Sequence, residues 1–190
     1  MKPRYVILAA LAATTLFALA AGSISKLPEP WLLAGQNPEH YDIGLDSGET
    51  VSGRGGKFIR NIDGVDKSWG TLMQSIAAKN YVGQRLRFQA KVKTSDVKSA
   101  GLWMRVDKPD KRATAFYNSQ DKPIVGSTGW QLRSVVLDVP ADSSEIAFGV
   151  LLHGKGQVWL DELSLEVVGK DVPVDSFPQK PSTPADRPSL

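Results

Sequence analysis

The stretch that decides the fold is RLRFQAKVK, residues 85–93. Its apolar side chains alternate strictly with basic and polar ones, at Leu86, Phe88, Ala90 and Val92. Successive side chains of a β-strand point to opposite faces of its sheet, so one face of this segment can be buried while the other meets water. We therefore predict a half-exposed β-strand here, and the rest of the chain has to supply its partners.

Segments of similar pattern follow on both sides of this strand. Further strands are expected near residues 41–45, 58–62, 72–76, 101–107, 113–118, 131–139, 146–152 and 157–168. Turn sequences that contain proline, glycine or aspartate separate them, as in KPD at 108–110 and GKG at 154–156. No segment has a convincing amphipathic helical pattern. The sequence predicts an all-β domain, an antiparallel β-sandwich of the jelly-roll type with about 8–10 strands.

The two ends of the chain differ in composition from the domain between them. Residues 1–20 combine the basic Lys2 and Arg4 with an apolar run and a small-residue cleavage site at Ala18–Ala20, which predicts a signal peptide or, alternatively, a membrane-anchor helix. We expect a linker over 21–30, the β-sandwich over 31–169 and a disordered proline-rich tail over 170–190. The protein is then exported to the periplasm or the medium, with membrane contact only through the N-terminal segment.

Charge and cysteine content exclude several classes of function. The chain has no cysteine, which removes disulfides, thiol nucleophiles and thiolate metal sites, so the domain must be held by its core alone. The formal charge of +3 falls to +1 without Lys2 and Arg4. No cluster of basic residues remains, and a nucleic-acid partner is not expected. We expect a monomer.

The last predicted strand carries a family resemblance. The phrase GQVWLDELSLE, residues 156–166, resembles the final strand of bacterial jelly-roll modules in the galactose-binding-like superfamily, which includes carbohydrate-binding modules of glycoside hydrolases. The early strand at 41–45 followed by SGRGGK at 52–57, and the Trp130-led strand that ends at Pro140, are similar to the same modules. A narrower group of bacterial domains, found alone as secreted proteins or as appendages, resembles residues 31–168. The resemblance implies a fold more than a function.

Catalytic and metal chemistry have few candidates in this sequence. There are two histidines, His40 and His153, and no nucleophile-elbow, zinc-protease, phosphate-loop or dinucleotide motif, so we expect a non-enzyme that needs no cofactor. The resemblance implies one exception, a structural Ca²⁺ held by Asp161 of the last strand and by Asp42, because related modules hold calcium near these strands. The alternative for Asp161 is a side chain that ties a loop backbone to the last strand.

One face of the segment GLWMRVD, residues 101–107, is the best candidate for a binding site. Trp103, Arg105 and Asp107 share that face by their spacing of two. The next predicted strand, if it pairs with this one, adds Phe116 and Asn118, and a third strand can add Gln74. An indole stacks on the apolar face of a sugar ring, while arginine, amides and carboxylates form directed hydrogen bonds. The alternative is that Trp103 belongs to the core and Arg105 forms a structural ion pair.

These patterns lead to three hypotheses about function. The first is an exported, non-catalytic module that binds carbohydrate or another polar ligand of the cell envelope. The second is a module that binds an envelope protein, for which a contiguous apolar patch would be the sign. The third is a hydrolase with an unrecognised site, which a buried His153 without a serine or carboxylate partner would count against.

Overall fold

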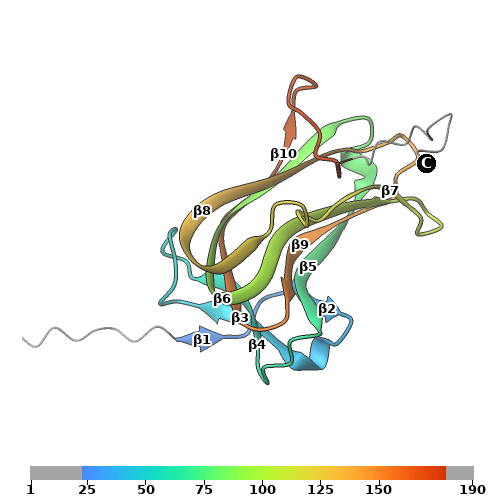
Figure 1. Ribbon diagram of the computed structural model, residues 1–190. Coiled ribbons are helices and arrows are strands. Elements are labelled where there is room, and N and C mark those ends of the chain that lie inside the picture. The colour runs from blue at the N-terminus through green and yellow to red at the C-terminus, as the bar shows by residue number, and fades with distance from the viewer. Residues whose placement is uncertain (1–22, 179–190) are drawn as a thin grey trace, which may run out of the picture.

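A computed structural model describes residues 23–178 and shows ten β-strands and two short 3-10 helices (Figure 1). The strands are β1 (Ile24–Ser25), β2 (Leu32–Gly35), β3 (Tyr41–Asp46), β4 (Gly56–Asn61), β5 (Trp69–Ala77), β6 (Arg85–Asp107), β7 (Ala113–Tyr117), β8 (Ile124–Asp138), β9 (Glu145–His153) and β10 (Gln157–Val168). The helices are η1 (Pro38–His40) and η2 (Ala78–Asn80). All strand pairs are antiparallel.

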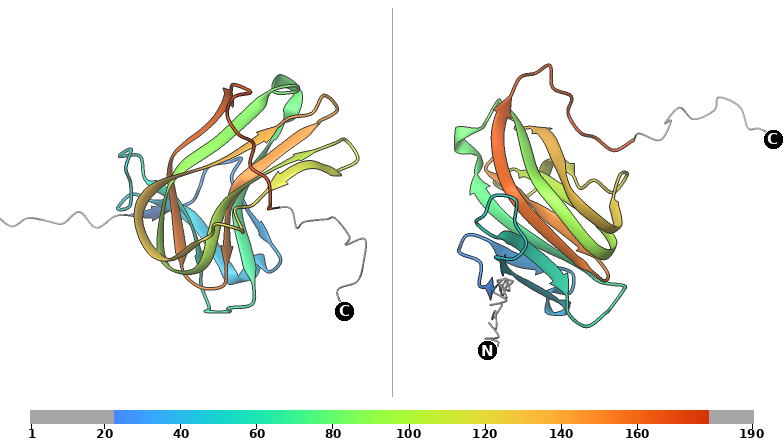
Figure 2. Two further views of the ribbon diagram at one scale, coloured as in Figure 1. Left: turned by 45° about the horizontal axis from the view of Figure 1, so that its top comes forward. Right: turned by 90° about the vertical axis from the view of Figure 1, so that its left-hand side faces the viewer.

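Strand β6 organises the whole domain because it is 23 residues long and takes part in both layers. Its first half pairs with β10 on one side and β8 on the other, and its second half pairs with β9 and β7. The sheet order β1-β3-β4-β10-β6-β9-β5-β2 therefore curls back on itself through β6. Figure 2 shows the resulting layers of strands in two further views.

The core lies between the two layers. Phe88 from the first half of β6 packs on Phe148 of β9, with ring centroids 4.9 Å apart. Leu86 and Met104, from the two halves of β6, are both fully buried. These contacts join side chains from both layers into one apolar cluster, and the predicted all-β antiparallel sandwich is confirmed.

Close backbone approach fixes the packing of β5 against β9. Gly149 of β9 lies so near β5 that a Cβ at this position would sit 2.1 Å from the carbonyl oxygen of Leu72. Only glycine is accommodated without a shift of one of the strands.

The domain begins before the expected boundary. Residues 21–30 were predicted to form a linker, but β1 pairs with β3 and Leu27 is buried in the main core at 6% exposure. The apolar side chain of Leu27 thus makes this segment part of the fold.

The domain also continues past residue 169, where disorder was predicted to begin. Residues 170–178, which we call the strap, leave β10 and pack back on the domain. Asp175 exchanges two hydrogen bonds with Val136 of β8, and Phe177 packs against Tyr117 of β7. These contacts compensate the strap's low content of apolar residues. The remainder of the predicted tail lies outside the described residues.

The predicted signal or anchor helix over residues 1–20 also lies outside the described part. Between residues 23 and 178, no helix has the length and apolar character needed to cross a bilayer.

Two strand glycines, Gly149 of β9 and Gly129 of β8, allow a matched test of the close approach between β5 and β9. Gly149→Ala should destabilise the protein by about 1–3 kcal/mol, because the methyl group forces β5 and β9 apart. Gly129→Ala in β8 should be nearly neutral, since nothing lies within 4 Å of the added Cβ. Urea denaturation measures both. Equal midpoints for the two variants would contradict the packing described here.

Candidate binding groove

The outer face of the layer formed by β2, β5, β9, β6 and β7 carries the candidate site. Strand register aligns its side chains in rows: Trp103 of β6 is paired with Gly149 of β9, which is paired with Met73 of β5. Two residues further along β9, Leu151 is paired with Thr71 of β5 on one side and with Gly101 of β6 on the other. Because side chains alternate, these residues lie on the outer face of the sheet, away from the main core.

A cavity of about 440 Å³ opens on this face, and we call it the outer groove. Its lining residues are Ala34, Gly35, Trp69, Thr71, Met73, Trp103, Arg105, Phe116, Asn118, Leu151 and His153. A smaller hollow of about 50 Å³ continues past Leu151 and His153 beneath the loop that follows Asn118. The groove is large enough for a small-molecule ligand.

Trp103 forms the floor of the groove and is fixed there by a hydrogen bond. Its indole Nε1 donates to Thr71 Oγ1 at 2.8 Å, and Thr71 in turn donates to the carbonyl of Val150 at 2.9 Å. Trp103 is only 6% exposed and packs with Ala147 and Leu151 in a second apolar cluster, separate from the main core. The polar atoms of Trp103 and Thr71 are thus satisfied, and the pair offers a ligand an apolar surface.

Arg105 supplies the groove's only positive side chain among its lining residues. Its Nε and Nη2 both lie 2.9 Å from Oδ2 of Asp107. Asp107 is 1% exposed, whereas the side chain of Arg105 is 44% exposed. The buried carboxylate therefore holds the guanidinium in place, and the exposed side of Arg105 remains open to a ligand.

His153 and Trp69 close the opposite end of the groove, with ring centroids 6.4 Å apart. Partial burial, together with the positive charge of Lys98, lowers the pKa of His153, which favours the neutral imidazole. A neutral imidazole can donate and accept hydrogen bonds at the same time.

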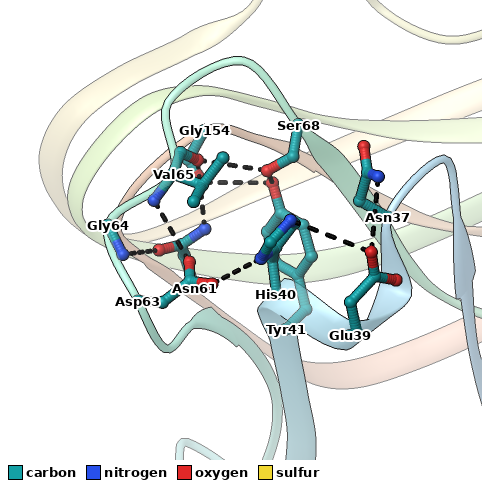
Figure 3. A network of polar contacts seen from close by, with 10 residues as sticks. All are labelled: Asn37, Glu39, His40, Tyr41, Asn61, Asp63, Gly64, Val65, Ser68 and Gly154. Atoms are coloured by element: carbon teal, nitrogen blue, oxygen red, sulfur yellow. Dashed lines mark hydrogen bonds and ion pairs between the residues drawn. The ribbon is translucent and has the colours of Figure 1, made fainter.

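A polar network behind the groove fixes this end (Figure 3). The hydroxyl of the buried Tyr41 lies 2.9 Å from Ser68 Oγ and donates to the carbonyl of Gly154 at 3.2 Å. The N–H of Gly154 donates to the carbonyl of Ser68 at 2.9 Å. Since Ser68 precedes Trp69 and Gly154 follows His153, the network sets the positions of both groove residues.

The structure brings together four of the six residues predicted for a ligand site. Trp103, Arg105, Phe116 and Asn118 all line the outer groove. Asp107 lies on the expected face but is buried behind Arg105.

Gln74 lies on the other face of its strand. It is paired with Phe148, a residue of the main core, and alternates with the groove residue Met73. The order of strands, which the sequence did not reveal, places Met73 rather than Gln74 beside Trp103. The prediction that Gln74 joins the site is therefore not supported by its position.

Several lining residues were not predicted as primary site residues. The sequence does not assign Thr71, Met73, Leu151 or His153 to the site, although all four line the groove. Their spacing of two places these residues on one face of β5 and of β9. They reach the same site as Trp103 only because β5, β9 and β6 are neighbours in the sheet. Those strands are separated in sequence by long stretches of chain.

The carboxylate of Asp161 does not fit the structural calcium site that the resemblance implied. Its two oxygens accept five hydrogen bonds of 2.6–2.9 Å from the loop after β3 and from the next backbone N–H; the donors are Thr50 Oγ1, Val51 N, Ser52 N, Ser52 Oγ and Glu162 N. These donors leave the carboxylate saturated, whereas a calcium site needs oxygen acceptors.

Asp42, the second predicted calcium ligand, is also engaged elsewhere. It accepts a hydrogen bond from Arg60 Nη2 at 2.7 Å. Asp42 and Gln157 of β10 are both paired with Arg60 of β4, so they lie at the same level of the sheet. Asp161 lies four residues further along β10, a separation of roughly 13 Å along the strand. The two carboxylates cannot share one ion. Over residues 23–178, no group of three or more histidine or acidic side chains is arranged to hold a metal.

The two histidines do not form a recognisable hydrolytic site. In the described part of the chain, His153 makes no side-chain hydrogen bond to a serine or a carboxylate. His40 contacts Asp63 through Nδ1, and its Nε2 faces Glu39 at 3.8 Å rather than a serine hydroxyl (Figure 3).

Comparison with solved structures agrees with this architecture. The CBM22-1 xylan-binding domain of Paenibacillus barcinonensis Xyn10C superposes with a TM-score of 0.54 at 13% identity, covering 78% of this chain and 96% of that domain. The CBM22-1–GH10 modules of Clostridium thermocellum xylanase 10B, complexed with xylohexaose, give 0.53 at 14% identity over 73% of this chain and 26% of that one. This chain has the fold of a carbohydrate-binding module. At such identities the likeness concerns the fold alone.

Sequence comparison gives a relative of a different kind. YbfP of Bacillus subtilis (strain 168), an uncharacterised HTH-type transcriptional regulator, is 37% identical over 152 residues, 79% of this chain. The chain spans about half (52%) of that relative's length. No family model matches. A helix-turn-helix needs two α-helices, and residues 23–178 of this chain contain none.

The five hydrogen bonds to Asp161 predict a pH-dependent contribution to stability. Burial raises the pKa of Asp161, but the donors of Ser52, Val51 and Glu162 outweigh that effect and hold the pKa well below its usual range. A carboxyl with a lowered folded-state pKa stabilises the fold above its unfolded pKa and loses that contribution as the pH falls.

We therefore expect Asp161→Asn to lower the free energy of unfolding by about 2–3 kcal/mol at neutral pH. The difference from wild type should shrink below roughly pH 4. Asp42→Asn is the control, since its exposed ion pair with Arg60 should contribute less than about 1 kcal/mol. Urea titrations at several pH values measure both, and a pH-independent difference at Asp161 would contradict this account.

Proposed function

We propose that this protein is an exported, non-catalytic module that binds carbohydrate in the outer groove. The observation that carries the proposal is the combination of aromatic surfaces with a few fixed polar groups in one cavity. Trp69, Trp103 and Phe116 can contact the apolar faces of sugar rings, while Arg105 and Asn118 can hydrogen-bond to hydroxyl groups.

The mixed lining favours a polar ring ligand over a protein surface. A docking site for a protein would be expected to present a contiguous apolar patch. Here Arg105, Asn118 and His153 interrupt the apolar residues at both ends of the groove. The fold shared with the xylan-binding CBM22 domain supports the same ligand class.

Binding without catalysis is also compatible with the relative's name. That name describes a transcriptional regulator, and the shared 152 residues are free of α-helix over their described part in this chain. No activity or ligand is carried over from this comparison.

A glycan array followed by calorimetry on the best ligand tests the proposal. Trp69→Ala and Phe116→Ala should each weaken binding by about tenfold or more, because each removes an aromatic contact from the groove. These residues are better targets than Trp103, whose burial means that its removal also disturbs the fold.

Trp130→Ala and Val125→Ala are the matched controls. Trp130 packs near Gly56, outside the groove, and Val125 of β8 is 63% exposed. Both variants should keep wild-type affinity. Absence of binding to any glycan, or equal weakening by groove and control variants, would overturn the proposal.

A further inference from the structure

The strap is anchored at its first end to the outer edge of β8 and to the start of β6. Arg85 Nη1 donates to the carbonyl of Lys170 at 2.8 Å, and Lys170 Nζ pairs with Asp138 at 2.9 Å. Further along, the N–H of Asp175 donates to the carbonyl of Val136, and the N–H of Val136 donates to Asp175 Oδ2, both at 2.9 Å. Asp175 thus satisfies edge groups of β8 as a neighbouring strand would.

The second end of the strap reaches the side of the outer groove. The ring of Phe177 lies 5.2 Å from that of Tyr117 and 6.2 Å from that of Phe116, measured between centroids. Asp175 Oδ1 also accepts a hydrogen bond from Lys122 Nζ at 2.9 Å. Lys122 belongs to the loop that leaves the groove after Asn118, so the strap holds both β7 and its following loop.

Strand β7 needs such support because its strand pairing is one-sided. Over residues 23–178 it pairs with β6 only, and it is five residues long. Its inward side chain, Tyr117, is 1% exposed, whereas Phe116 on the groove side is 42% exposed. The strap lies on the unpaired side of β7 and joins it to β8.

We propose that the strap positions the wall of the outer groove, with Phe177 as the positioning residue for Phe116 and Asn118. Phe177 does not line the groove, and it acts by packing against the unpaired side of β7. A wall held in one arrangement before binding loses less conformational entropy when a ligand arrives. The effect on ligand affinity rests on the proposed function; the effect on the groove wall does not.

Three variants separate positioning from general stability. Phe177→Ala removes the packing, and Phe177→Tyr keeps the ring. Val174→Ala removes apolar atoms from the same strap at a side chain that is 36% exposed and is not packed on the core. The full chain is used throughout, with thermal unfolding to establish that each variant is folded at the temperature of measurement.

Two readouts are compared for each variant. The first, which needs no ligand, is the NMR shift of the Phe116 backbone amide and of the Asn118 side-chain amide. The second is affinity for the best glycan of the array. We expect Phe177→Ala to move both resonances and to weaken binding by about two- to tenfold. Phe177→Tyr and Val174→Ala should resemble wild type in both readouts.

The outcomes distinguish this inference from the proposed function. Unchanged Phe116 and Asn118 resonances in Phe177→Ala, or equal changes in Val174→Ala, would refute a positioning role for the strap. Shifted resonances with undiminished glycan affinity would also refute it. If no glycan binds wild type, the proposed function fails, and the resonances alone decide whether the strap holds the groove wall.

Discussion

The domain depends on the sharing of β6 between its two layers. A single strand of 23 residues gives Phe88 and Leu86 to one layer and Leu102 and Met104 to the other. It therefore determines the position of four other strands: β10 and β8 pair with its first half, and β9 and β7 pair with its second half. Because every inward side chain of β6 meets the same core, displacement of this strand would disturb both layers at once.

The same strand also builds the outer groove. Alternation that buries Leu102 and Met104 turns Trp103 and Arg105 to the opposite face, where β9 and β5 add their own outward side chains. Charged and aromatic residues reach this face in fixed positions because polar groups behind them hold them by hydrogen bonds. Asp107 holds Arg105, and Thr71 holds the indole of Trp103. The groove is thus a consequence of the sheet rather than of flexible loops.

Prediction from the sequence worked best where the signal was local. Period-two alternation at residues 85–93 and 101–107 identifies both halves of β6, although the sequence predicts two separate strands there. Trp103, Arg105, Phe116 and Asn118 lie together because two segments close in sequence pair as expected. Gln74 could not be placed correctly, since its face depends on the pairing of β5 with β9 across a long separation. The strap was missed because its anchors, such as Asp175 and Lys170, are polar groups whose partners are distant in sequence.

By itself, the sequence determined an all-β sandwich, the inward and outward faces of its clearest strands, and the absence of cysteine chemistry. Those properties follow from the alternation of neighbouring side chains and from composition, which need no knowledge of distant contacts. Only the tertiary structure decided that Asp161 secures a loop instead of a cation and that Trp69 and His153 meet Trp103. It also decided that Phe177 packs on Tyr117 beside the groove. Each of these outcomes depends on which strands become neighbours, and that choice is made by burial of the whole core rather than by any one segment.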